Sequence, residues 1–212
     1  MNAGFSNLDT LKKQLLAGTM KNDVRFDATI LVIGQGVAGQ FETFCNRKFM
    51  RVVGDTEILP ADRCQFLLSR FPLEAITAVD LKMTEALGFE SQSPTTFYNT
   101  VGLKSGIVNC PEGADAGPWY AQVRFTYTGG YWWETLEPDD ASFPSSMPAE
   151  ASPLPQELFL AWVLQCRHLW SQIDKLGTDI LKDGKPSSLR FPEEFAPTVQ
   201  KTLGQFTRYN LV

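Results

Sequence analysis

The stretch from Val123 to Pro155 constrains the fold of this chain most, because it joins a strand to a helix through a long polar segment. Residues 123–128 alternate between apolar and polar side chains, which predicts a strand with one buried face. Gly129 and Gly130 end this run, since glycine adopts the positive φ angles of tight turns. A proline-rich segment follows, and a helix is predicted to begin near Pro155. This order differs from the strand–helix alternation of a parallel α/β sheet, so it indicates another fold class.

Helical periodicity marks both ends of the chain. A short helix is predicted near Asp9, where the leucines at 8, 11, 15 and 16 form an apolar stripe. Apolar residues then recur every three or four positions from Phe26 to Phe44, which predicts a longer helix. Further helices are predicted at Pro155–Leu176 and Pro197–Phe206. We expect one face of the Pro155–Leu176 helix to pack on the apolar face of the Phe26–Phe44 helix. The face of the Pro155–Leu176 helix consists of Leu158, Ala161, Trp162, Gln165, Leu169 and Ile173.

The middle of the chain carries the patterns of short strands, with Pro72 marking a turn or a sheet edge. We therefore predict an α+β subunit, with a helical bundle body made from the N- and C-terminal helices and a β-rich insertion. One domain overall would divide into N-terminal helices (1–49), the insertion (50–133), a proline-rich connector loop (134–153) and C-terminal helices with a tail (154–212). The predicted strands are Gln65–Leu68, Ala75–Leu81, Thr96–Val101, Gly106–Val108 and Trp119–Thr128.

Charge and cysteine content argue against several classes of protein. The net charge is -5, so the average surface does not attract nucleic acid by releasing counterions. No apolar run reaches the roughly 18 residues of a membrane span, and Met1–Gly4 leads into a polar helix start without the pattern of a signal peptide. The four cysteines are far apart and form no C-x-x-C pair, which disfavours zinc and a disulfide scaffold and suits a reducing cytosol.

A G-x-G-x-x-G pattern at Gly34, Gly36 and Gly39 raises the alternative of a nucleotide-dependent oxidoreductase. The acids Asp55 and Glu57 follow at about the distance expected of a ribose-binding residue. However, the helical period continues through the glycines, and the strands that follow are not separated by helices. We therefore expect the three glycines within or beside a buried helix, where their small size lets a neighbouring helix approach.

Other residues with catalytic chemistry lack suitable partners in the sequence pattern. His168 is the only histidine, and Ser105 misses the G-x-S-x-G pattern by one position. The acid pairs at 139–140 and 193–194 are adjacent in sequence, which is typical of solvated loops. No catalytic residue, metal or cofactor is expected. Three tryptophans support a third interpretation, in which the chain is a β-module that binds carbohydrate or a host surface. They are Trp119, Trp132 and Trp133.

Taken in order, the blocks of this chain resemble the head–tail connector (adaptor, or head completion) proteins of tailed double-stranded-DNA bacteriophages. The resemblance extends over nearly the whole chain, and it depends on the order and spacing of blocks that are weak one by one. Two stretches are long for the family, 90–118 and 134–153. The matching blocks are Leu8–Lys13, Phe41–Phe49, Phe66–Val79, Tyr127–Tyr131, Leu154–Ala161 and Pro197–Tyr209.

This resemblance implies a structural virion protein of the neck, assembled in the host cytoplasm, and not an enzyme. Such proteins form a ring, inferred from the family to be a dodecamer, beneath the portal vertex. They extend the DNA channel and offer a platform to the next neck, stopper or tail protein. The implied partners are further copies of the chain, the portal protein, that downstream protein and packaged DNA passing without sequence-specific contact. An acidic chain suits sliding DNA, because a basic lining would hold phosphates.

The C-terminal segment from Phe206 to Val212 mixes aromatic, apolar and cationic residues, a composition typical of a docking tail. In related adaptors this end reaches toward the portal. The resemblance therefore implies a portal-docking role for Arg208, Tyr209, Leu211 and Val212.

Overall fold

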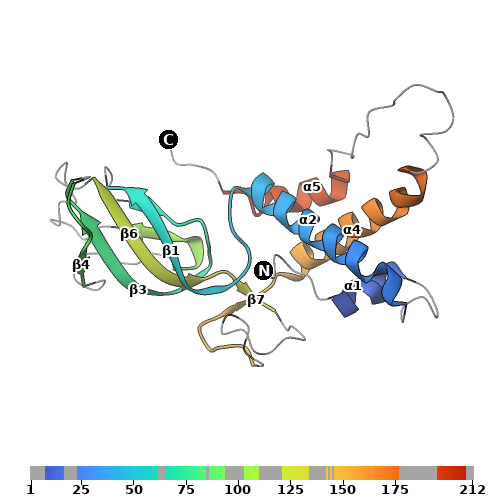
Figure 1. The fold of residues 1–212 in the computed structure, drawn as a ribbon, viewed down its shortest axis with the longest axis horizontal. Coiled ribbons are helices and arrows are strands. Elements are labelled where there is room, and N and C mark those ends of the chain that lie inside the picture. The colour runs from blue at the N-terminus through green and yellow to red at the C-terminus, as the bar shows by residue number, and fades with distance from the viewer. Residues whose placement is uncertain are drawn as a thin grey trace, which may run out of the picture. The chain divides into compact units, whose positions relative to one another are not determined.

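The computed structural model confirms an α+β fold, with helices and antiparallel sheets in separate parts of the chain (Figure 1). It describes residues 8–16, 23–61, 65–84, 86–93, 103–109, 121–133, 142, 144, 146–176 and 195–208. The chain divides into two compact units. The helical unit comprises residues 1–46 and 154–212, and the β unit comprises residues 47–153.

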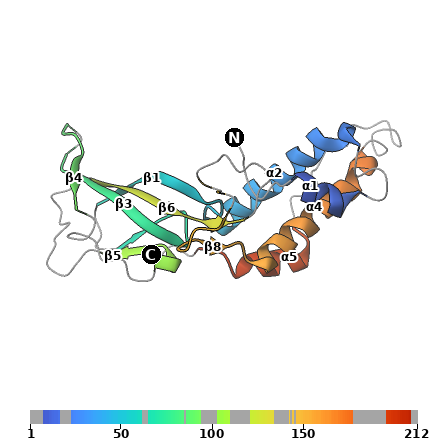
Figure 2. The same ribbon diagram turned by 90° about the horizontal axis from the view of Figure 1, so that it is seen from below.

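Helix α2 (Asp27–Cys45) packs on helix α4 (Gln156–Leu176) in the helical unit (Figure 2). Helices α1 (Leu8–Leu15) and α5 (Pro197–Gly204) each contact both of them. A 3-10 turn, η2 (Val24–Phe26), leads into α2. The predicted helices are therefore present in the described residues.

The buried faces of α2 and α4 follow the predicted spacing. Ile30, Val37 and Phe41 of α2 are fully buried, as are Leu158 and Trp162 of α4. Two expectations need correction, because Phe44 is 38% exposed and Leu169 is only half-buried. The side chain of Ile173 lies outside the described residues. Leu11, Leu16, Val199 and Leu203 complete this core from α1, its C-terminal end and α5.

Local chemistry sets the ends of these helices. The Asp23 carboxylate accepts a hydrogen bond from the Arg25 backbone N–H at 2.9 Å, which caps η2. Asn46 ends α2 in the left-handed region, with φ of 50°, where asparagine is tolerated better than most residues. Helix α4 begins at Gln156, one residue later than expected, and the Pro155 carbonyl accepts from the Phe159 N–H at 3.1 Å. The sequence boundaries were thus correct to within a residue or two.

A four-stranded antiparallel sheet forms most of the β unit, with strand order β1-β6-β3-β4. Its strands are β1 (Val52–Pro60), β3 (Leu73–Lys82), β4 (Glu90–Gln92) and β6 (Gln122–Gly129). Strands β2 (Gln65–Leu67) and β5 (Ile107–Asn109) form a second antiparallel sheet, preceded by the 3-10 turn η3 (Leu103–Ser105). Strands β7 (Tyr131–Trp132) and β8 (Ser152–Pro153) pair in parallel.

The predicted inward face of β6 is confirmed, because Val123, Phe125 and Tyr127 are fully buried. Phe66, from β2, packs on Phe125 with ring centroids 5.3 Å apart, so the small sheet covers the large one. Gly130 turns the chain between β6 and β7 at φ of 98°, and a Cβ there would lie 2.5 Å from the Met50 carbonyl oxygen. Only glycine fits this turn.

Four strands of the described residues are not among the predicted ones: β1, β4, β7 and β8. Gly54 has a φ of 69° and lies at a bulge in the β1–β6 pairing, so Gly54 and Asp55 resemble a turn in sequence while continuing a strand. The predicted strand Thr96–Val101 lies outside the described residues, as does half of the 134–153 loop. The end of that loop forms β8.

Candidate assembly surfaces

The glycine pattern lies inside α2, and not at the strand-to-helix turn that a dinucleotide fold requires. Gly34 is buried, and its carbonyl accepts a hydrogen bond from Trp162 Nε1 at 3.0 Å. The predicted close approach of a neighbouring helix is therefore confirmed at Gly34. It is wrong at Gly36 and Gly39, which are exposed, because nothing lies within 4 Å of a Cβ built on either residue. The geometry thus contradicts the nucleotide-binding reading of this pattern.

The acids proposed for ribose binding belong to the β unit and have protein partners. Asp55 accepts from Arg70 Nε at 2.7 Å. Glu57 accepts from the Ser69 backbone N–H and from the Tyr127 hydroxyl, both at 2.9 Å. Burial, followed by the charge of Glu57, raises the pKa of Tyr127. These carboxylates stabilise the β unit locally.

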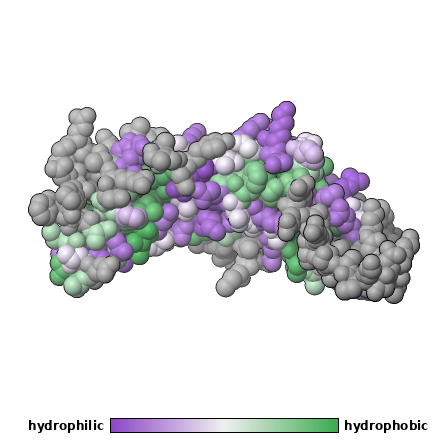
Figure 3. All heavy atoms as spheres, turned by 90° about the horizontal axis from the view of Figure 1, so that it is seen from above, coloured by the Kyte–Doolittle hydropathy of each residue, from purple (hydrophilic) through white to green (hydrophobic). Residues whose placement is uncertain are grey.

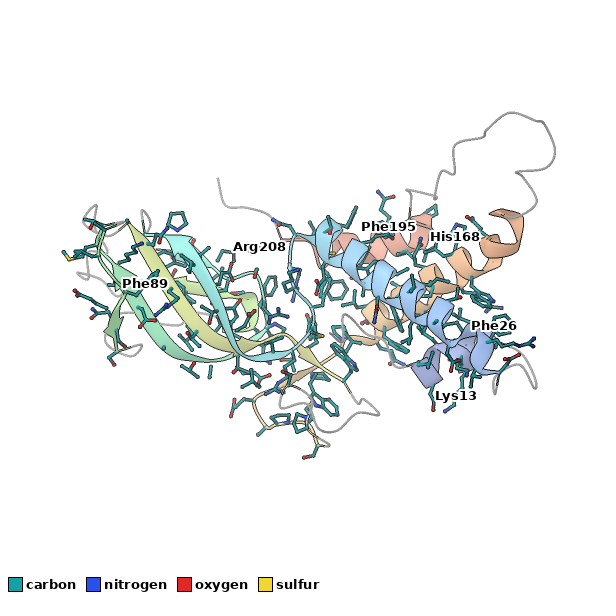
Figure 4. The ribbon with its side chains drawn as sticks, viewed as in Figure 1. Lys13, Phe26, Phe89, His168, Phe195 and Arg208 are labelled. Carbon is teal, nitrogen blue, oxygen red and sulfur yellow. The ribbon has the colours of Figure 1, made fainter. Side chains whose placement is uncertain are left out.

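The remaining candidates for chemistry are dispersed. His168 is half-buried on α4, with its Nε2 3.0 Å from Gln172 Nε2, and it is labelled in Figure 4. Ser105 is exposed in η3. Trp132 and Trp133 are half-buried, while Trp119 and both acid pairs lie outside the described residues. Within the described part of the chain, no group of three metal-ligating side chains occurs, and no helix is long and apolar enough to span a membrane.

The described cysteines behave as small core residues. Cys45 and Cys166 are free and buried. Burial raises the pKa of the Cys166 thiol to about 12, so it stays protonated at neutral pH. The Cys45 thiol lies 3.5 Å from the Leu203 carbonyl oxygen, to which it donates. The contact between Cys45 and Leu203 joins α2 to α5.

Of the four expected docking residues, the structure describes only Arg208. Its backbone N–H donates to the Cys45 carbonyl at 2.8 Å, which ties the start of the tail to the end of α2. The Phe206 N–H donates to the Leu203 carbonyl at 2.9 Å. Tyr209, Leu211 and Val212 lie outside the described residues. Arg208, labelled in Figure 4, is therefore anchored at the end of α2.

The outer face of α2 lacks charge. No charged residue occurs in Ala28–Phe41, although about one residue in five of the chain is charged. Val32 is 68% exposed on this face. Depletion of charge on an exposed surface is a mark of interface centres. We call the exposed row along it the α2 stripe; it consists of Ala28, Val32, Gly36, Gly39 and Thr43.

The outer face of α4 carries exposed leucines. Leu160 is 56% exposed and Leu164 is 40% exposed, one helical turn apart. These two leucines are not among the predicted functional residues, although their spacing of four residues, offset by two from Leu158 and Trp162, signals a second apolar face. We call this row the α4 stripe; it consists of Glu157, Leu160, Leu164, Arg167 and Ser171. In Figure 3, neutral and weakly apolar residues gather between polar ones over the helical unit.

Exposed apolar residues in the β unit are separate from one another in sequence. Val53 and Ile58 lie on β1, which is an edge strand, while Met83 and Leu87 lie between β3 and β4. The surface beside them is ionic: Arg124 donates to Asp80 at 2.9 Å and stacks over Phe89 with 4.3 Å to the ring centroid. The two helical stripes are therefore the more continuous candidates for assembly.

No family model matches the chain, and no curated protein matches its sequence. Solved structures match its fold. One is a chain in the neck of an empty gene transfer agent (GTA) particle computed with C6 symmetry, at 15% identity and a TM-score of 0.59, covering 98% of this chain and 91% of that chain. Another is in the virion of a native GTA particle, at 12% identity and a TM-score of 0.53, with the same coverage of 98% and 91%. The resemblance to neck proteins is therefore confirmed at the level of the fold.

Proposed function

We propose that this chain is a structural subunit of the neck of a tailed, phage-like particle, a head–tail adaptor that forms a ring under the portal vertex. The observation that carries the proposal is the extent of the fold likeness, which covers 98% of this chain and 91% of a chain from a GTA neck. A match of that extent includes the helices, the β unit and their order along the chain. The order of sequence blocks supports the same role independently.

The described geometry favours a structural role over the oxidoreductase alternative. Gly36 and Gly39 lie in the middle of a helix, where backbone N–H groups are used by the helix itself and do not point at a pyrophosphate. Asp55 and Glu57 form hydrogen bonds within the β unit. The residues that would carry the cofactor therefore already have structural roles.

A ring extends the DNA channel and offers neighbouring proteins a platform of identical sites. The related GTA neck was computed with C6 symmetry, which agrees with a cyclic arrangement of copies. The net charge of -5 suits a channel that does not hold DNA phosphates. Many identical weak contacts add through effective concentration, so a subunit that is monomeric alone still binds stably in a ring.

The test is assembly with the portal protein of the same particle. The full chain is mixed with purified portal, sedimented, and imaged by negative-stain electron microscopy. We expect an added ring at one end of the portal and co-sedimentation of the two proteins. A chain that neither sediments with the portal nor changes its outline would contradict the proposal, and saturable micromolar binding of NAD, NADP or FAD would favour the enzyme instead.

The portal-docking role of the tail is a finer proposal. Arg208 is held at the end of α2 and α5, so the residues after it start from a defined point. Deleting residues 209–212 should leave the fold intact and abolish co-sedimentation with the portal. Gln205→Ala, at an exposed position just before the tail, is the matched control and should bind normally. Normal portal binding by the truncated chain would show that another surface docks.

A further inference from the structure

The α2 and α4 stripes lie on opposite sides of one helix pair. Val32 is two residues from Ile30 and Gly34, and Leu160 is two residues from Leu158 and Trp162, which are all buried. Two residues correspond to a rotation of about 200° around a helix. Since the buried faces of α2 and α4 meet each other, their exposed faces point away from each other.

The two stripes have complementary shapes. On α2, a Cβ at Gly36 or Gly39 would meet nothing within 4 Å, so the helix backbone is open to close approach there. On α4, Leu160 and Leu164 project from successive turns, which makes a ridge of the i, i+4 type. Ridges of this type pack into the grooves of a facing helix. At Gly36 and Gly39 the surface of α2 therefore forms a shallow groove, and the ridge of Leu160 and Leu164 on α4 has the shape to fill it.

Their charges are also complementary. The acids Asp27 and Glu42 bound the uncharged stretch of α2 on its two sides. Arg167 follows Leu164 on the α4 stripe and is exposed. When the two helices run parallel, Arg167 lies toward Glu42, and Glu157 of the α4 stripe lies toward Asp27, whose charge Lys12 balances at 2.6 Å. Apolar contacts in the centre with charges at the rim are the usual anatomy of a protein interface.

We propose that the occupant of the α2 stripe is the α4 stripe of a second copy of this chain. The inference rests on the proposed function, because a ring requires each subunit to present two different faces to its two neighbours. The chain presents two such faces, one groove and one ridge, on opposite sides of the same helix pair. Successive copies therefore join head to tail through α4 of one subunit and α2 of the next.

Cross-linking of the full chain tests this pairing at high protein concentration. Cys64 and Cys110 are changed to serine, and a flexible bismaleimide links introduced cysteines. A chain with Val32→Cys and Leu164→Cys should give a ladder of oligomers. An equal mixture of the two single-cysteine chains should give one heterodimer band, and each chain alone should give none. The matched control replaces Val32→Cys with Gln200→Cys, at an exposed position of α5, and should give no ladder.

Charge at either stripe should block the same contact. Gly36→Glu on the α2 stripe or Leu160→Glu on the α4 stripe, each added to the double-cysteine chain, should lower the ladder about tenfold, since a carboxylate must be buried without a partner. Gln200→Glu should leave it unchanged, and circular dichroism checks that each variant is folded.

Three results would overturn the inference: no ladder, a ladder of equal yield from the control pair, or homodimers from the Leu164→Cys chain alone. Imaging with the portal separates this inference from the proposed function. A ring without the ladder overturns only the pairing of α2 with α4. A ladder without portal binding keeps the pairing and contradicts the adaptor role.

Discussion

The helical unit and the β unit satisfy their polar groups in different ways. Helices α2 and α4 form their backbone hydrogen bonds internally, so their contact requires little more than apolar faces and one side-chain bond from Trp162 to Gly34. The β unit has bulges and turns, whose carbonyls need donors from elsewhere. Arginines supply them, because Arg47 donates to the Phe71 carbonyl, Arg51 to Ser142 and Arg70 to Met50.

The same arginines are held by further contacts within the β unit. Arg51 forms a two-pronged ion pair with Glu74, at 2.7 and 2.8 Å, and both side chains are buried. The Arg47 guanidinium lies 3.4 Å from the ring centroid of Phe71. Regular backbone therefore tolerates an apolar interface, whereas irregular backbone requires long side chains with several donors beside the core. Changes that remove apolar volume should therefore affect the helical unit most, and changes that remove donors should affect the β unit most.

The largest effect is expected from Trp162→Ala in the helical unit. Trp162 is fully buried and its indole N–H donates to the Gly34 carbonyl, so truncation leaves a cavity and removes this second hydrogen bond to a helical carbonyl. The free energy of unfolding should fall by about 3–5 kcal/mol, measured by urea denaturation with far-ultraviolet circular dichroism. Leu160→Ala, on the exposed face of the same helix, is the control and should cost well under that. Equal losses from the two variants would show that α4 is not oriented as described.

Arg51→Met should have the next largest effect, and it should act on the β unit. It leaves the buried Glu74 carboxylate without its partner and the Ser142 carbonyl without its donor. We expect a loss of about 3 kcal/mol in the free energy of unfolding. The double variant Arg51→Met with Glu74→Leu should recover part of that loss, because no buried charge remains. A single variant as stable as wild type would mean that apolar burial alone stabilises this unit.

Tyr127→Phe should give a smaller loss, about 1–2 kcal/mol at neutral pH, by removing the hydroxyl that donates to Glu57. It should also change the response to alkali. Burial and Glu57 raise the pKa of Tyr127, so folding favours its neutral form. That contribution is complete below the unfolded pKa of about 10 and is lost as pH rises toward the folded value. Between about pH 9 and 11 the variant should therefore lose less free energy of unfolding than the wild-type chain, as measured by denaturation series at those pH values. An identical alkaline loss in both proteins would contradict the buried, neutral state of Tyr127.

The smallest effect, of opposite sign, is expected from Gly36→Ala on the α2 stripe. Alanine has a higher helix propensity than glycine, and a Cβ there meets no atom within 4 Å. The isolated chain should gain up to about 1 kcal/mol in the free energy of unfolding. In the ring the added methyl group should instead narrow the proposed groove and reduce cross-linking between stripes. A destabilised isolated chain would show that α2 packs against something at this position.

The fold class, the helices and the strands β2, β3, β5 and β6 follow from local periodicity in the sequence, whereas β1, β4, β7 and β8 do not. Spacing of three or four residues identified α2 and α4, and alternation identified the buried face of β6. Composition and resemblance predict the docking-tail residues, and of these the structure describes only Arg208, which is bonded to the end of α2.

Only the tertiary structure decided which neighbour covers each face. Gly34, Gly36 and Gly39 look equivalent in sequence, yet Trp162 reaches Gly34 from more than a hundred residues away while the other two stay exposed. Gly54 resembles a turn until β6 pairs with the strand on both sides of it. Periodicity is a property of neighbouring residues and can be read along the chain. Burial depends on segments distant in sequence, so it is set only when those segments pack together.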